Sequence, residues 1–184
     1  MNSQQLIETA KALIVAKKGI LAADESTNTI KKRFDSIGID STETTRRDYR
    51  QMLFVTEDIT SFISGVILFD ETIRQESSDG DLLVSKIVDQ GIIPGIKVDK
   101  GAKALAGSQG ETITEGLDGL RERLNEYYEL GARFTKWRGV LSIGASLPSP
   151  YCVEANAHAL GRFAALSQEA NLVPIVEPEL LMDG

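Results

Sequence analysis

Short apolar runs alternate with amphipathic stretches along the whole chain. Five runs are rich in Val, Ile, Leu and Phe, and their nearly continuous apolar character is typical of strands buried in a parallel sheet. The predicted strands are Gly19–Ser26, Gly65–Thr72, Ile93–Lys100, Phe134–Leu141 and Val173–Leu180.

Between these runs, apolar residues recur every three or four positions, which predicts helices. The predicted helices are Ser41–Val55, Asp81–Gln90, Ile113–Leu130 and Pro150–Ala170, and helical spacing also marks Met1–Lys18. Ser41 is the expected N-cap of its helix, with Thr44 in the capping-box position. Gly91 and Gly131 follow two of the helices, where glycine favours termination.

Alternating strands and helices predict an α/β fold with a parallel sheet in a single domain, residues 1–184. A doubly wound sheet and a barrel both accommodate five strands, and periodicity does not distinguish them. A complete (β/α)8 barrel typically needs about 250 residues. The length of 184 residues falls short of that.

Composition narrows the range of partners. The net charge of −7 disfavours nucleic acid and anionic membranes as partners. Cys152 and His158 are the only residues of their types, so we expect no intramolecular disulfide and no zinc site of His and thiolate ligands. A carboxylate site for a harder ion stays open. The first 18 residues do not resemble a signal peptide, and the apolar stretch Phe62–Phe69 is too short to span a bilayer. The expected location is cytoplasmic.

Charged residues interrupt the carboxyl ends of four predicted strands. Because side chains two residues apart share a strand face, these ends present four polar pairs. The pairs are Asp24 with Ser26, Lys97 with Asp99, Lys136 with Arg138, and Glu177 with Glu179. Active sites of barrels and open parallel sheets form at this end of the strands. The alternative is a purely structural network of buried ion pairs.

Convergence of these groups would also tune their chemistry. A lysine beside another cation in a dry cavity has a lowered pKa, and a carboxylate among carboxylates has a raised one. Arg138 suits bidentate phosphate recognition. The set fits a carbonyl or phosphate-bearing substrate that is handled without a metal.

An ordered set of motifs then points to a family. The motifs are KGILAADEST (18–27), GVILFDET (65–72), GIKVDKG (95–101), GETITEGLDGL (110–120), KWR (136–138) and VPIVEPELLMDG (173–184). Together they resemble the class I fructose-bisphosphate aldolases. The resemblance implies a (β/α)8 TIM barrel, of which this chain supplies strands one to five. It also implies a cytoplasmic lyase of glycolysis and gluconeogenesis. That enzyme cleaves fructose 1,6-bisphosphate reversibly to dihydroxyacetone phosphate and glyceraldehyde 3-phosphate through a lysine Schiff base. The resemblance therefore also implies no metal and no cofactor.

The resemblance also implies residue roles. Asp24 matches an aspartate of carbinolamine and C–C bond chemistry, and Lys136 a proton-transferring lysine beside the Schiff base. Glu177 matches the general acid/base, and Glu179 a carboxylate that supports the imine lysine. The remaining matches are to substrate-binding positions on the phosphate side: Ser26, Thr29, Arg33, Lys97 and Arg138. Thr29 stands where many relatives have serine, and its β-branched side chain is stiffer.

One family feature is missing. The Schiff-base lysine of the family lies in a segment resembling GTLLKPNM, and this sequence contains no such segment. We therefore expect the 184 residues to be the N-terminal portion of an aldolase and to be inactive alone. The family is commonly tetrameric, so a homo-oligomer is expected for the full-length protein. Two other functions remain open: a different lysine-dependent sugar-phosphate lyase, and a non-catalytic sugar-phosphate-binding or interaction module.

Overall fold

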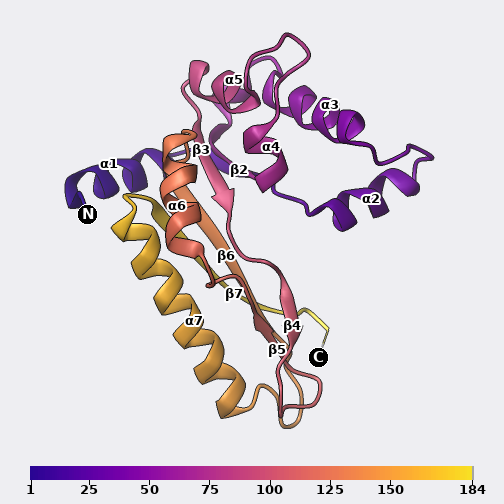
Figure 1. Ribbon diagram of the computed structural model, residues 1–184, viewed down its shortest axis with the longest axis vertical. Coiled ribbons are helices and arrows are strands. Elements are labelled where there is room, and N and C mark those ends of the chain that lie inside the picture. Colours follow the sequence, from indigo (N-terminus) through magenta and orange to yellow (C-terminus); the bar gives the residue numbers. More distant parts are fainter. Residues whose placement is uncertain (184) are drawn as a thin grey trace.

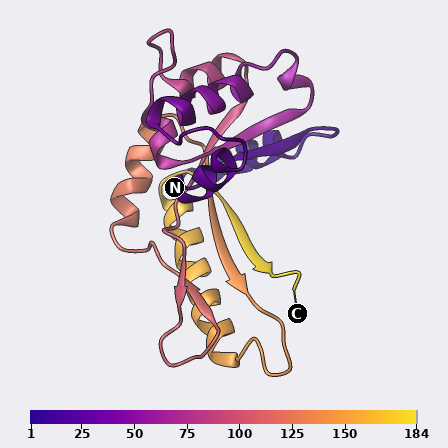
Figure 2. The ribbon, with the colours of Figure 1, turned by 90° about the vertical axis from the view of Figure 1, so that its right-hand side faces the viewer.

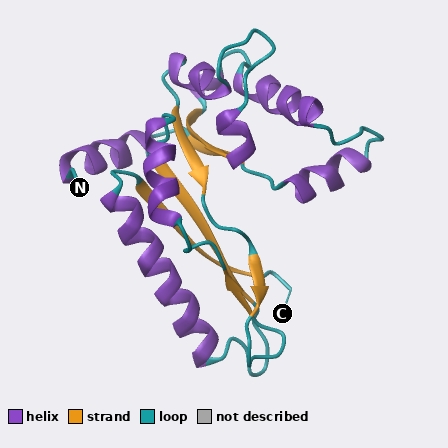
Figure 3. Cartoon of the chain, in the orientation of Figure 1, coloured by secondary structure: helices purple, strands orange, loops and turns teal. Residues whose placement is uncertain are grey.

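The structure is a computed structural model that describes residues 1–183, and a five-stranded sheet runs through it (Figures 1 and 3). All neighbouring strands in this sheet are parallel, in the order β1-β2-β3-β6-β7. The strands are β1 (Gly19–Ala23), β2 (Ile63–Leu68), β3 (Ile93–Lys97), β6 (Phe134–Leu141) and β7 (Val173–Leu180). The predicted bounds of β6 and β7 are confirmed.

The strand order decides between the two architectures that periodicity left open. A doubly wound sheet reverses its strand order at a switch point, and a barrel does not. Here the order of the strands in the sheet, from β1 at one edge to β7 at the other, is the same as their order along the chain. The sheet also curls (Figure 2). The architecture is therefore a partial (β/α)8 barrel.

The helices mostly follow the predicted order. They are α1 (Ser3–Leu13), α2 (Thr27–Asp35), α3 (Glu43–Phe54), α4 (Asp70–Arg74), α5 (Leu83–Asp89), α6 (Leu120–Glu129) and α7 (Pro150–Glu169), with a short 3-10 turn η1 at Ile59–Ser61. Gly91 and Gly131 follow α5 and α6 with positive φ angles, as the C′ position favours. The N-cap of α3 is Thr42 in a box with Thr45, so the expected cap at Ser41 is wrong by one residue.

The prediction of a helix over Ile113–Leu130 is wrong in its first part. Thr112–Thr114 forms β5, which pairs antiparallel with β4 (Ala102–Ala104) in a separate hairpin. The hydroxyls of Thr112 and Thr114 donate to backbone carbonyls of β6. These tertiary bonds favour the extended conformation, and α6 begins only after Gly119.

Three strands, β1, β2 and β3, end earlier than predicted. Beyond β1 and β2, polar residues start the next helix. Ser26 is the N-cap of α2, and Asp70 opens α4. The polar residues that follow β1 and β3 therefore lie in loops at the carboxyl edge of the sheet. They still face the same end of the barrel, as the active-site hypothesis requires.

The outer face of the sheet carries the larger core, under α6 and α7 (Figure 1). Trp137 of β6 is fully buried and packs on Phe163 of α7. His158 lies exposed on α7, and Cys152 is buried near the start of that helix.

The inner face carries a smaller apolar layer at the amino ends of the strands. It is centred on Phe134, which packs with Ile67 and with Leu13 of α1. Gly65 and Gly95 leave room for the Phe134 ring. A Cβ atom at Gly95 would lie 2.3 Å from ring carbons of Phe134.

Glu111 ties the β4–β5 hairpin to the start of α7. Its carboxylate accepts bonds from the Ser108 hydroxyl and from the hydroxyl and backbone N–H of Ser149, the N-cap of α7. The Ser108 and Ser149 hydrogen bonds hold the pKa of Glu111 at about 2, below its ordinary value of 4.5. The anchor is thus a carboxylate that stays ionised in mild acid.

Gly95→Ala should lower the free energy of unfolding by about 1–3 kcal/mol, because the new methyl group displaces the Phe134 ring in a closely packed layer. Urea unfolding measures the loss. Gly161→Ala is the control, since Gly161 lies in α7 with open space around its Cβ position. This change should stabilise the helix by about 0.5–1 kcal/mol. Equal effects of the two substitutions would contradict the packing argument.

Acid should weaken the hairpin anchor within a defined range. The pKa of Glu111 is lowered by folding, so its contribution is present above about pH 4.5 and is lost as the pH falls towards about 2. Thermal unfolding between these values should show a shallower pH dependence in Glu111→Gln than in the wild type. Glu154→Gln, on the exposed surface of α7, serves as the control. Parallel curves for wild type and Glu111→Gln would contradict this role.

Candidate functional site

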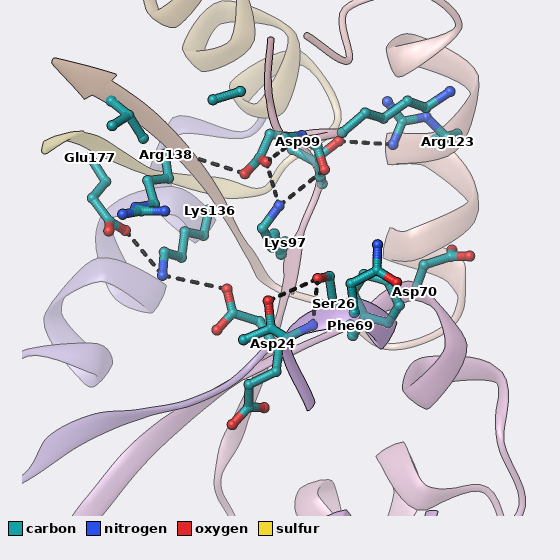
Figure 4. Close-up of a pocket in the computed structure, with 18 of the residues that line it drawn as sticks. Asp24, Ser26, Phe69, Asp70, Lys97, Asp99, Arg123, Lys136, Arg138 and Glu177 are labelled. Carbon is teal, nitrogen blue, oxygen red and sulfur yellow. Dashed lines mark hydrogen bonds and ion pairs between the residues drawn. The ribbon is translucent and has the colours of Figure 1, made fainter. Parts of the chain in front are cut away.

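The polar strand ends line one cavity of about 1020 Å³ at the carboxyl edge of the sheet (Figure 4). All nine residues that the sequence nominated contribute to its wall. They are Asp24, Ser26, Thr29, Arg33, Lys97, Lys136, Arg138, Glu177 and Glu179. The structure thus brings the whole predicted set together, while the role of each residue stays a prediction.

Lys136 is the centre of one ion-pair cluster. Its Nζ atom lies 3.4 Å from Asp24 Oδ2 and 3.1 Å from Glu177 Oε2 (Figure 4). Three strand spacings separate β1 from β6, about 14 Å in a flat sheet. Only the curl of the sheet allows Asp24, just after β1, to reach Lys136.

The two carboxylates decide the protonation of Lys136. Burial lowers the pKa of its ammonium group, but Asp24 and Glu177 outweigh that effect and raise the pKa above the ordinary lysine value. The expectation of a lowered lysine pKa is therefore wrong for Lys136. It assumed that neighbouring cations dominate, whereas the nearest charged groups are carboxylates. A lysine that holds its proton this firmly is a poor nucleophile at neutral pH.

A second ion pair joins Lys97 and Asp99. The Lys97 ammonium donates to the Asp99 carboxylate and also to the Asp99 backbone carbonyl at 3.2 Å. The spacing of two residues on one face predicted that these side chains would be near each other. The alternative interpretation of these residues was a structural ion pair. That ion pair exists, and Lys97 and Asp99 both line the cavity as well.

Arg138 and Glu179 form a third pair, a two-pronged one. The Nε atom of Arg138 donates to Glu179 Oε2, and Nη2 donates to Oε1 at 2.8 Å. The Arg138 hydrogen bond lowers the pKa of Glu179, although burial opposes the shift. The expected upward shift of a carboxylate among carboxylates is wrong here, because Glu179 has its own arginine.

The loop after β1 forms the opposite side of the cavity. The Ser26 hydroxyl accepts from the Thr29 backbone N–H at 3.3 Å and lies 3.0 Å from the Thr29 hydroxyl. The Ser26 hydroxyl therefore caps α2, whose positive N-terminal end borders the cavity, and the Thr29 hydroxyl bonds to this cap. Arg33, further along α2, is paired with Glu25.

Sequence reasoning did not single out two arginines that support the site. Arg50 is fully buried, and its Nη2 donates at 2.6 Å to the backbone carbonyl of Glu25, between Asp24 and Ser26. Arg123 lines the cavity and donates to the backbone carbonyl of Val98 at 3.0 Å. Each contact spans 25 residues. No local pattern indicates such contacts.

Two kinds of feature, a cluster of metal ligands and a membrane-spanning helix, are absent from the described residues 1–183. No group of three or more His, Cys, Asp or Glu side chains lies close enough together to hold a metal ion. None of the helices in that range is long and apolar enough to cross a membrane.

Comparison with known proteins gives one consistent family. Residues 5–184 match the model of the family described as fructose-bisphosphate aldolase class-I. A probable fructose-bisphosphate aldolase class 1 of Xanthomonas campestris is 61% identical over 184 residues, all of this chain and 55% of that protein. The cytosolic fructose-bisphosphate aldolase 4 of Arabidopsis thaliana is 52% identical over 184 residues, again all of this chain but 47% of that protein.

A solved structure agrees in fold. It is a fructose-bisphosphate aldolase from Plasmodium falciparum, crystallised in complex with TRAP and a small-molecule inhibitor. The match has a TM-score of 0.97 at 49% identity and covers 99% of this chain and 53% of the other. The chain therefore spans about half the length of the relatives it matches.

The pKa of Lys136 should fall when its carboxylate partners are neutralised. In the double variant Asp24→Asn/Glu177→Gln, burial remains while the opposing charges are gone, so the pKa should drop below that of the wild type. An NMR titration of the lysine ¹³Cε resonances measures it. Glu154→Gln removes a distant carboxylate and should leave the titration unchanged. A Lys136 pKa that is the same in the double variant would contradict this account.

Proposed function

Because the chain belongs to the class I fructose-bisphosphate aldolase family, we propose that the whole protein cleaves fructose 1,6-bisphosphate reversibly through a lysine imine. The products are dihydroxyacetone phosphate and glyceraldehyde 3-phosphate. The observation that carries this proposal is the position of Lys136 between Asp24 and Glu177, in a cavity that also holds Lys97 and Arg138. Proton-transfer groups and anion-binding groups thus share one cavity.

The geometry supports a helper role for Lys136. An ammonium held by two carboxylates can stabilise negative charge and donate a proton, but it is not ready to attack a carbonyl. We therefore assign the imine to a lysine outside these 184 residues. Glu177 is placed to exchange protons with Lys136 as general acid/base, and Asp24 to handle the proton at the bond that is cleaved.

The remaining residues would bind and support. Lys97 and Arg138 offer positive charge to phosphate, and Ser26 and Thr29 offer hydroxyls at the N-terminal end of α2. Arg33 adds a cation beside the same loop. Glu179, kept ionised by Arg138, supports the imine lysine as a carboxylate rather than as an acid.

Assembly and location are part of the same proposal. The sheet ends at β1 on one side and β7 on the other, and eight strands close a barrel of this type. We infer that the whole protein completes the barrel, forms a homo-oligomer of four subunits and works in the cytoplasm. Several relatives are named as cytosolic or cytoplasmic enzymes, which supports the location.

A chimaera tests the proposal. Residues 1–184 fused to the remaining C-terminal part of the Xanthomonas campestris relative should cleave fructose 1,6-bisphosphate. Lys136→Met should lower kcat by about 10²–10⁴-fold, the range expected for loss of a proton-transfer group. Lys11→Met, on the exposed surface of α1, is the matched control and should leave kcat unchanged.

Borohydride trapping identifies the imine lysine. With substrate present, mass spectrometry should find the reduced adduct on a lysine of the relative's part of the chimaera. The 184-residue chain alone should bind the substrate without forming an adduct. An adduct on Lys136 or Lys97 would overturn the assignment. Binding of the substrate by a fully folded chimaera that cleaves nothing would favour a non-catalytic sugar-phosphate-binding protein.

A further inference from the structure

We propose that Asp99 is a positioning residue of the anion-binding side of the cavity, acting through Lys97. The proposal rests on the sugar-phosphate site proposed above and adds a residue to it. Asp99 lies in the loop after β3, and its side chain is 2% exposed. A carboxylate this deeply buried needs several hydrogen-bond donors to offset its lost hydration.

The Asp99 carboxylate has donors from three places. Its Oδ1 accepts from the Lys97 ammonium and from the Gly101 backbone N–H at 3.0 Å, and its Oδ2 accepts from the Arg138 backbone N–H at 3.3 Å (Figure 4). One side chain thereby connects the loop after β3 to β6. These two strands carry the cations proposed to meet phosphate.

The Lys97 ammonium has three hydrogens. Two of them go to Asp99, one to its carboxylate and one to its backbone carbonyl. The third remains for a ligand in the cavity that Lys97 lines. A long, flexible lysine side chain loses much rotamer freedom on binding, and Asp99 removes that cost before a ligand arrives.

The backbone that carries Asp99 is itself held tightly. Arg123 donates to the carbonyls of Val98 and Gly116, at 3.0 and 2.6 Å. Gly116 has a φ of +132°, and a Cβ atom there would lie 3.2 Å from Asp99 Cα. These contacts hold the backbone of Asp99 in place, so its carboxylate can fix the orientation of the Lys97 ammonium.

When Asp99 is replaced, a purely electrostatic role and a positioning role predict opposite changes in phosphate binding. A carboxylate near a phosphate repels it, so removing the charge alone would tighten phosphate binding. If Asp99 positions Lys97, its loss must weaken binding instead. Glu126→Gln provides the matched control, because Glu126 lines the same cavity and pairs with Arg74 rather than with Lys97.

The test is a binding series on the 184-residue chain, by isothermal titration calorimetry with fructose 1,6-bisphosphate and with inorganic phosphate. Asp99→Asn should weaken binding of the sugar bisphosphate about tenfold, while Glu126→Gln should bind as well as the wild type or better. In the Lys97→Met background, Asp99→Asn should add less than a twofold loss, because the route through Lys97 is already gone. Thermal unfolding confirms that each variant is folded.

Asp99→Glu covers the case in which Asp99→Asn does not fold. It keeps the charge but moves the carboxylate by one methylene, so it too should weaken binding. Amide hydrogen exchange gives a readout that needs no ligand, and the Gly101 and Arg138 amides should exchange about tenfold faster in Asp99→Asn.

The outcomes separate the two proposals. Asp99→Asn binding as tightly as Glu126→Gln, or losses that multiply in the Lys97→Met background, would overturn the role of Asp99 alone. Unchanged exchange at Gly101 and Arg138 would do the same. A wild-type chain that binds neither ligand would overturn the sugar-phosphate site itself, and the positioning role with it.

Discussion

The ion-pair cluster of Lys136 with Asp24 and Glu177 depends on the curl of the sheet, and the cavity depends on that cluster. β1 and β7 are the two edge strands of the sheet, yet Lys136 contacts both Asp24, just after β1, and Glu177 of β7. The order of the parallel strands permits the curl, and the small inner layer around Phe134 fills the end of the barrel below the cavity. Packing at one end of the strands thereby sets the charge geometry at the other.

The charged groups at the strand ends are paired with one another before any ligand binds. Asp24 and Glu177 keep Lys136 protonated, Arg138 keeps Glu179 ionised, and the Lys97 ammonium is bonded to Asp99. Such fixed charges need little reorganisation during a reaction, which is the main way in which electrostatics contributes to catalysis. The same ion pairs offset the free-energy cost of burying these charges. The interpretation as a structural ion-pair network and the interpretation as a functional site therefore describe the same residues.

Much of this could be predicted from local patterns, and the failures share a cause. The bounds of β6 and β7 followed from apolar runs, and period-two spacing at the strand ends identified seven of the nine site residues that line the cavity. The other two, Thr29 and Arg33, were identified only through the family resemblance. The predicted helix began at Ile113, wrongly, because the hydroxyls of Thr112 and Thr114 bond to β6, a contact that no local pattern reveals. The supporting contact of Arg50 with the Glu25 backbone carbonyl was not predicted for the same reason.

The sequence by itself determined the alternation of strands and helices, the polar residues at the strand ends and the family to which the chain belongs. These features depend on side-chain type and short spacing, which are written in the chain directly. Only the tertiary structure decided the barrel-like strand order, the direction of the pKa shifts of Lys136 and Glu179, and the place of Asp99 between two strands. A pKa or an ion pair depends on which charge is nearest, and folding alone sets those distances.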